Sequence, residues 1–190
     1  MNSGATVRLT PHEVALLRGG PRAAVTVAVL ALHLLGAVEA GRPGTVRVSG
    51  EPGGAGQALS PLSDAVLASL QQPAAVAELL RRATVRQALD EMRGSLLSAG
   101  LLRSLPPRRT RAARRALDAL YADHPLPAGR RGLSTEDTLM AVALHGDPAL
   151  TVLAGRFALR AGLTARAEVA GKGLLRHSER SPYSCGGVAD

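Results

Sequence analysis

The sequence has 190 residues, of which 46% are hydrophobic and 2% aromatic, and it carries a formal net charge of +8 at pH 7. Because the apolar residues are mostly Ala, Leu and Val, with one Phe, two Tyr and no Trp, the composition favours closely packed helices over sheets, which prefer bulkier side chains. The positive charge points to anionic partners such as nucleic acid, anionic lipid or acidic peptides, and a single cysteine excludes an internal disulfide.

The N-terminal region predicts a cytoplasmic protein. Residues 1–8 lack the charged, apolar and small-residue blocks of a signal peptide. The longest uncharged apolar stretch, 23–38, is shorter than the roughly 20 residues that a membrane-spanning helix needs. We therefore expect no membrane span.

A helix start opens the first predicted unit, 1–50. Thr10 can cap a helix whose first residue is Pro11, and Glu13 can return a hydrogen bond to the cap. The pair Gly19-Gly20 is expected to stop this helix.

A second helix and a short strand complete this unit. Pro21 opens a helix that continues to Leu35, where Gly36 supplies a glycine C-cap. Residues 45–48 alternate as a strand, and 51–58 form a glycine-rich linker.

The pattern restarts in the second predicted unit, 59–105. Ser60-Pro61 begins a helix to about Leu70, and Pro73 begins another. Residues 84–87 have the pattern of a capping box, and the third helix that follows has one apolar face: Val85, Leu89, Met92 and Leu96. Three helices followed by an extended segment are typical of a winged helix-turn-helix, so we predict a mainly α protein of tandem helix-turn-helix units with short wing strands near 45–48 and 101–105.

The rest of the chain divides into three segments. An Arg- and Pro-rich connector, 106–132, contains one helix from about residue 111 to 121. A C-terminal helix pair, 133–165, breaks at His145-Gly146-Asp147-Pro148 as the first pair breaks at Gly20-Pro21. The last segment, 166–190, is expected to be a flexible tail.

Two motifs resemble an uncharacterised actinobacterial family over about residues 9–165. Leu9–Pro21 matches its opening, Leu-Thr-Pro-x-Glu followed by Gly-Gly-Pro, and Met140–Gly146 matches its Ala-Val-Ala-Leu-x-Gly core. Members usually have a membrane segment where this chain has the arginine-rich connector, and a Gly-rich tail with cysteines that resembles Cys185-Gly186-Gly187. The resemblance implies a soluble member of the family.

The resemblance also implies a partner. Family members lie beside multinuclear non-haem iron enzymes that modify cysteines in small peptides. This implies a protein accessory to such an enzyme, and winged-helix units in these systems hold a peptide as an added strand against the wing.

The sequence offers no pattern typical of an enzyme or a metal site. The histidines at 12, 33, 124, 145 and 177 lack close partners at ligand spacing, and no serine or cysteine lies on a glycine turn of the nucleophile type. We expect His12 to face solvent and His33 to be partly buried with a backbone partner. We therefore expect a non-catalytic protein without a cofactor or metal, whose partner is a protein or peptide.

The strongest candidate for binding is the basic region 76–131, which contains twelve arginines and five acidic residues. The candidate partner- or anion-binding residues are Arg81, Arg82, Arg86, Arg93, Arg108, Arg109, Arg111, Arg114 and Arg115. DNA binding by a winged-helix regulator is the alternative, although Asp90 and Glu91 on the third helix would repel phosphates. A solvated face with pairs such as Arg114 and Asp118 would explain the same pattern without a function.

Cys185 is the candidate modification site. It is either an incidental thiol with an ordinary pKa or part of a short peptide, 181–187, presented to a modifying enzyme.

Overall fold

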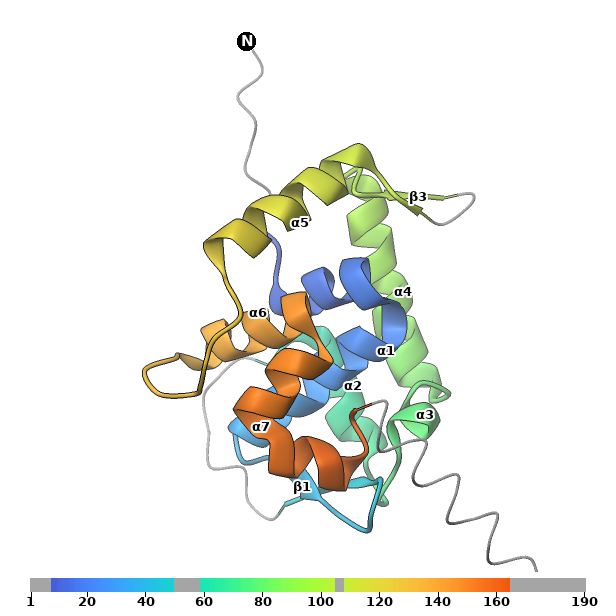
Figure 1. Cartoon of the computed structure of the whole chain (residues 1–190). Helices are drawn as coiled ribbons and strands as arrows, with labels where there is room; N and C mark the ends of the chain where they lie inside the picture. Colours follow the sequence, from blue (N-terminus) through green and yellow to red (C-terminus); the bar gives the residue numbers. More distant parts are fainter. Residues whose placement is uncertain (1–7, 50–58, 105–107, 165–190) are drawn as a thin grey trace, which may run out of the picture.

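The protein is mainly helical and has small antiparallel sheets (Figure 1). The computed structural model describes residues 8–49, 59–104 and 108–164, and every structural statement below refers to these. The elements in chain order are α1 (Pro11–Leu34), β1 (Val38–Ala40), β2 (Val46–Val48), α2 (Pro61–Ser69), α3 (Val76–Leu79), α4 (Ala83–Ser98), β3 (Leu102–Arg103), β4 (Arg108–Arg109), α5 (Arg111–Asp123), α6 (Thr135–His145) and α7 (Asp147–Ala161).

Helix α1 contains both helices predicted for the first unit. Thr10 and Glu13 form the predicted capping box, with the Thr10 amide donating to Glu13 Oε2 at 2.8 Å. The backbone leaves the helical region at Gly20, with φ 75° and ψ −166°, and Pro21 starts the second part. A positive φ is accessible to glycine at little cost, so the predicted stop at Gly19-Gly20 is confirmed as a sharp break.

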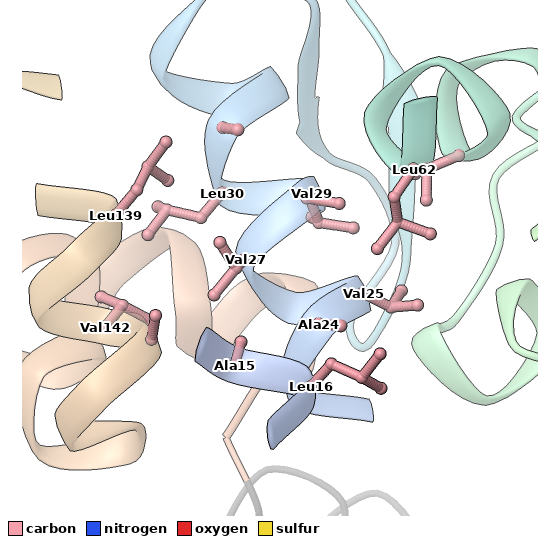
Figure 2. Close-up of a cluster of buried hydrophobic side chains, with 14 of the residues drawn as sticks. Ala15, Leu16, Ala24, Val25, Val27, Val29, Leu30, Leu62, Leu139 and Val142 are labelled. Carbon is pink, nitrogen blue, oxygen red and sulfur yellow. The ribbon is translucent and has the colours of Figure 1, made fainter. Parts of the chain in front are cut away.

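The second part of α1 lies at the centre of the core. Figure 2 shows Val27 and Leu30 on the side of α6, whose Leu139 and Val142 face them, while Leu62 of α2 covers the other side. The buried residues of α1, α2, α4, α5, α6 and α7 belong to one hydrophobic cluster. The predicted segments therefore share a core.

The C-terminal helix pair follows the prediction. Ser134 caps α6 through a capping box with Asp137, and α6 gives way to α7 at Gly146, where φ is 66°. Helix α7 ends at Gly162, after which the Leu163 amide donates to the Ala158 carbonyl at 2.9 Å. Gly36 and Ala37 close α1 with the same arrangement, so the predicted glycine cap at Gly36 is confirmed.

The predicted strands form hairpins with partners that the sequence did not indicate. Strand β2 pairs with β1, and β3 pairs with β4, both antiparallel. Ala74 forms an isolated bridge with Val46 of β2, through reciprocal amide-to-carbonyl bonds of 2.9 Å. The predicted start of a helix at Pro73 is therefore wrong: the backbone of Ala74 pairs with Val46, and the short α3 begins at Val76.

The predicted capping box at 84–87 is also wrong. Helix α4 already begins at Ala83, and the Thr84 hydroxyl hydrogen-bonds the Ser69 hydroxyl of α2 at 2.8 Å. Gln87 donates to Glu91 one turn ahead instead of returning to the cap. The apolar face of this helix is confirmed, because Val85, Leu89 and Leu96 are buried.

Helix α1 is long and apolar enough to cross a membrane by length and composition. In the structure, 67% of its most apolar window is buried inside the protein, and Gly20 interrupts the helix. Its apolar side chains pack against α2 and α6, so the structure is compatible with a soluble protein.

Candidate functional site: a basic cleft beside the second hairpin

A cleft of about 820 Å³ lies where the break in α1 faces α4, the β3–β4 hairpin and α5. Its walls combine arginines with leucines. The lining residues are Leu16, Leu17, Gly20, Pro21, Arg93, Leu97, Leu102, Arg103, Ser104, Arg109 and Arg114.

The break in α1 shapes the floor of the cleft. Leu16 and Leu17 are buried side chains at the end of the first part of α1, and Gly20-Pro21 turns the chain away from this point. On the α4 side Leu97 is 39% exposed, which is unusual for a large apolar side chain on a helix that otherwise buries its leucines. The floor is thus apolar and partly open to solvent.

Thr110 holds the hairpin and α5 together at the edge of the cleft. Its hydroxyl donates to the Gly100 carbonyl at 2.9 Å, and its amide donates to the Leu101 carbonyl at 3.0 Å. The same hydroxyl caps α5 by accepting the Ala113 amide at 3.2 Å. These bonds fix β4 and the first turn of α5, which carry Arg109 and Arg114.

The cleft brings together part of the predicted basic set. Arg93, Arg109 and Arg114 line it, and they come from α4, β4 and α5. Arg103 of β3 also lines it and was not among the predicted residues. The sequence contained a signal for Arg103, because Arg103 and Arg109 flank a Pro-Pro pair, and a hairpin at that pair would bring the two arginines side by side.

The other predicted arginines lie elsewhere. Arg82 is the N-cap of α4, eleven residues before Arg93, which corresponds to about 16 Å along the helix axis. Arg81 and Arg82 border the α3–α4 turn together with Glu78. Arg86 lies on α4 and Arg108 in β4, while Arg111 and Arg115 are exposed on α5 without lining the cleft.

The guanidinium groups of the cleft are only partly balanced by carboxylates. Arg93 forms an ion pair with Asp90 at 2.8 Å. Within the described residues, no carboxylate lies within 4.0 Å of the charged groups of Arg103, Arg109 or Arg114, so the Arg114–Asp118 pair of the solvated-face alternative does not form. A guanidinium stays charged at any physiological pH, so the cleft is a positively charged site.

A second polar cluster lies in the interior, around His12. The prediction that His12 faces solvent is wrong: it is 7% exposed, and its Nε2 lies 3.2 Å from Ser60 Oγ and 3.3 Å from Ser63 Oγ. Burial lowers the pKa of His12 to about 4, although the nearby Glu13 carboxylate acts in the opposite direction.

This cluster has the residue types of a nucleophilic pair but not the access. Ser63 is 1% exposed. Ser60 Oγ donates a hydrogen bond to Ser63 Oγ at 2.9 Å, so the Ser63 hydroxyl can donate its own proton to Nε2 of a neutral His12. A substrate has no route to this hydroxyl. The cluster therefore joins the starts of α1 and α2.

The remaining described histidines have structural contacts. His33 is half-buried and donates from Nδ1 to the Val38 carbonyl at 3.2 Å, as predicted, while its ring stacks on Phe157 at 3.6 Å. His145 donates to the His124 carbonyl at 2.8 Å. Among the residues that the structure describes, no three His, Cys, Asp or Glu side chains are grouped to hold a metal ion.

Cys185, the candidate modification site, and His177 lie outside the described residues.

Chemically, the cleft can bind an anion beside an aliphatic group. Guanidinium groups donate charge-assisted hydrogen bonds to carboxylates or phosphates, and the leucines supply an apolar surface. In the comparisons with known proteins, no family model matches this chain, and no curated protein or solved structure is significantly similar to it.

Proposed function

We propose that this protein is a non-catalytic adaptor that recognises an acidic, partly apolar segment of a partner protein in its basic cleft. The observation that carries the proposal is the meeting of Arg93, Arg103, Arg109 and Arg114 around an open leucine floor. Acidic side chains of the segment bind the arginines, and a neighbouring leucine-sized side chain lies on Leu97.

An acidic peptide matches the cleft better than a small inorganic anion. The volume of about 820 Å³ is in the range of sites that enclose several side chains. A free phosphate would use the guanidinium groups and leave the exposed part of Leu97 in water. A peptide with alternating acidic and aliphatic residues contacts both the guanidinium groups and the exposed part of Leu97.

The hairpin supplies backbone recognition in this proposal. Strands β3 and β4 form a two-stranded sheet, and an outer edge of such a sheet can accept an extended peptide as a further strand. This is the winged-helix mode of binding, with α2, α3 and α4 as the helical part and the hairpin as the wing. By the family resemblance, the partner is a peptide or an iron enzyme that modifies it, in the cytoplasm.

DNA binding is the second candidate, supported by the arginines along α4 and the hairpin. On a DNA-binding surface, phosphate contacts would be spread along the helix, including Arg81, Arg82 and Arg86. The exposed carboxylates of Asp90 and Glu91 lie in the middle of that path and oppose it.

A titration with two variants of equal charge separates the candidates. The probe is a fluorescein-labelled peptide of alternating Glu and Leu, followed by fluorescence anisotropy at physiological salt. The cleft variant carries Arg103→Gln and Arg109→Gln, and its control carries Arg81→Gln and Arg82→Gln at the far end of α4.

We expect the cleft variant to bind the peptide at least about tenfold more weakly and the control to match the wild type, since each lost charge-assisted hydrogen bond is worth about 1.5 kcal/mol or more. Equal losses in both variants would show a non-specific charge effect and contradict the proposal. Tight binding of a DNA duplex that both variants weaken equally would favour the second candidate.

A further inference from the structure

A second groove, of about 900 Å³, lies between α5, the start of α6 and the residues that precede α1. On the α5 side it is bordered by Ala112, Ala116, Ala119 and Leu120. Across from them lie Leu9, Leu101 and Met140, which belong to the buried core. The groove is therefore an apolar channel between elements that are far apart in the sequence.

Helix α5 has more apolar residues than it buries against the rest of the protein. Ala113 and Leu117 are buried against the rest of the protein. Ala112 and Ala119 are exposed, and Ala116 and Leu120 are half-buried, although all four are on the groove side. This face spans about 12 Å of helix, or two turns, without a covering element among the described residues.

The rim of this groove is acidic at the end where α5 finishes and α6 begins. Asp123 is the last residue of α5, and Glu136 and Asp137 are in the first turn of α6. The hydrogen bonds from the Ser134 side chain and backbone hold the pKa of Asp137 below its usual range, and the charge of His124 lowers it further. In a chain with a net charge of +8, this rim carries three carboxylates against Arg8 and His124.

We infer that the groove between α5 and α6 binds an amphipathic helix of a partner protein, with a lysine or arginine at the end that meets Asp123, Glu136 and Asp137. The site and its partner chemistry are independent of the basic cleft, which takes an acidic segment. One protein would thus hold an acidic segment and a basic helix on two sides of α5.

A helix fits the groove better than an extended strand does. The alanines at 112, 116 and 119 have small side chains, so the backbone of a second helix can approach α5 to the roughly 8–10 Å of ordinary helix packing. None of the lining residues belongs to a strand, so the groove offers no strand edge for an extended peptide. Leucine-sized residues at i, i+3, i+4 and i+7 of the partner would fill the channel.

Charge complementarity decides the sign of the partner. The three carboxylates attract a basic group, while the carbonyl end of α5 and the amide end of α6, which both lie there, carry opposite partial charges. An acidic helix would meet like charge at this end. The preferred occupant is therefore basic where the helix meets the rim.

Selection from a displayed library of helical peptides tests the inference on the full chain. The enriched peptides are synthesised, labelled and titrated against the wild type, Ala119→Arg and Ala122→Arg. Both substitutions place the same side chain on an exposed position of α5, but residue 119 lines the groove and residue 122 does not. A third variant, Asp123→Asn with Glu136→Gln, removes charge from the rim.

We expect enriched peptides with a heptad-like apolar face and a basic end, whose affinity falls at least about tenfold for Ala119→Arg and is unchanged for Ala122→Arg. The Asp123→Asn and Glu136→Gln variant should bind severalfold more weakly, and the difference should shrink in high salt. Peptides without this pattern, or peptides indifferent to Ala119→Arg, would overturn the inference.

Two further measurements separate this groove from its alternatives. Sedimentation of the wild type that shows a dimer abolished by Ala119→Arg would make a second copy of the chain the occupant and overturn a partner helix. The Arg103→Gln and Arg109→Gln variant should bind the selected peptides as the wild type does. Loss of binding in that variant would transfer them to the basic cleft and also contradict the inference.

Discussion

The backbone of Gly44 contacts the backbone of Gly162. Gly44 lies in the turn between β1 and β2, and Gly162 lies at the end of α7. A Cβ atom on Gly162 would lie 2.9 Å from the Cα of Gly44 and 3.2 Å from its carbonyl oxygen. The Gly44 amide donates to the Arg160 carbonyl at 2.8 Å. This contact joins the first hairpin to the last described helix.

Gly162→Ala should therefore destabilise the protein by about 2–3 kcal/mol. The residue has φ 69°, which is costly for alanine, and its new methyl group would collide with the turn at Gly44. Urea denaturation followed by circular dichroism measures the change in the free energy of unfolding.

Gly94→Ala is the matched control and should have the opposite sign. Gly94 is inside α4 without a positive φ, and the space that a methyl group would occupy there has no atom of another element within 4 Å. Alanine should therefore stabilise the helix by about 0.5–1 kcal/mol. Similar unfolding energies for Gly162→Ala and the wild type would show that the hairpin is not held against α7.

Acid should destabilise the protein through His12. Its pKa is about 4 in the folded state, against 6.5 for an ordinary histidine, so the unfolded chain binds the proton more readily. The contribution is complete above pH 6.5 and is lost as the pH falls from 6.5 toward 4, by an amount on the order of 3 kcal/mol. Urea titrations at a series of pH values measure this loss.

His12→Gln separates this group from other titrating groups. The amide can still hydrogen-bond the hydroxyls of Ser60 and Ser63 but has no proton to gain in this range. The variant should lose less stability than the wild type between about pH 6.5 and pH 4.5. Parallel curves for the two proteins would mean that burial of His12 does not perturb its pKa.

Several helix boundaries could be predicted from the sequence, because their signals are local. Thr10 and Ser60 cap α1 and α2 at the positions that the sequence indicates, and Gly36 ends α1 as expected. Each of these signals needs only the backbone groups within one helical turn.

Features that depend on distant partners were harder to predict. Ala74 left its expected helix because Val46, far away in the sequence, offers a strand to pair with. The local sequence around His12 indicates a surface residue. Its burial is favourable because the hydroxyls of Ser60 and Ser63, about 50 residues away in the sequence, hydrogen-bond its ring. The basic cleft likewise depends on the fold, since α1, α4, the hairpin and α5 each supply part of it.

Thr110→Val should weaken both the fold and the cleft. The variant loses the α5 cap and the hydroxyl bond to Gly100, which together should cost about 1–2 kcal/mol. Because Thr110 positions Arg109 and Arg114, the affinity for the acidic peptide should also fall.

Thr110→Ser is the conservative control, since serine keeps the hydroxyl and is a good N-cap. It should restore most of the stability and the affinity, as measured by urea denaturation and fluorescence anisotropy. If Thr110→Val changes stability but leaves the affinity at the wild-type value, the hairpin is positioned without this side chain.

Binding to duplex DNA should be weak, indifferent to sequence and absent near physiological salt. The cleft gathers a small number of arginines, so few counterions are released on binding, and the resulting low affinity is lost before physiological salt is reached. The path toward Arg82 along α4 crosses the exposed Asp90, whose carboxylate already pairs with Arg93 at 2.8 Å and repels phosphates. Anisotropy titrations of two unrelated duplexes between low and physiological salt measure this dependence, with Asp90→Asn as the variant that removes the repulsion.

The acidic peptide should lose less affinity over the same salt range, because its aliphatic side chains contact Leu97 and apolar contact does not depend on counterions. A protected site on one duplex at physiological salt, strengthened by Asp90→Asn, would reverse this order and make DNA the ligand of the basic surface.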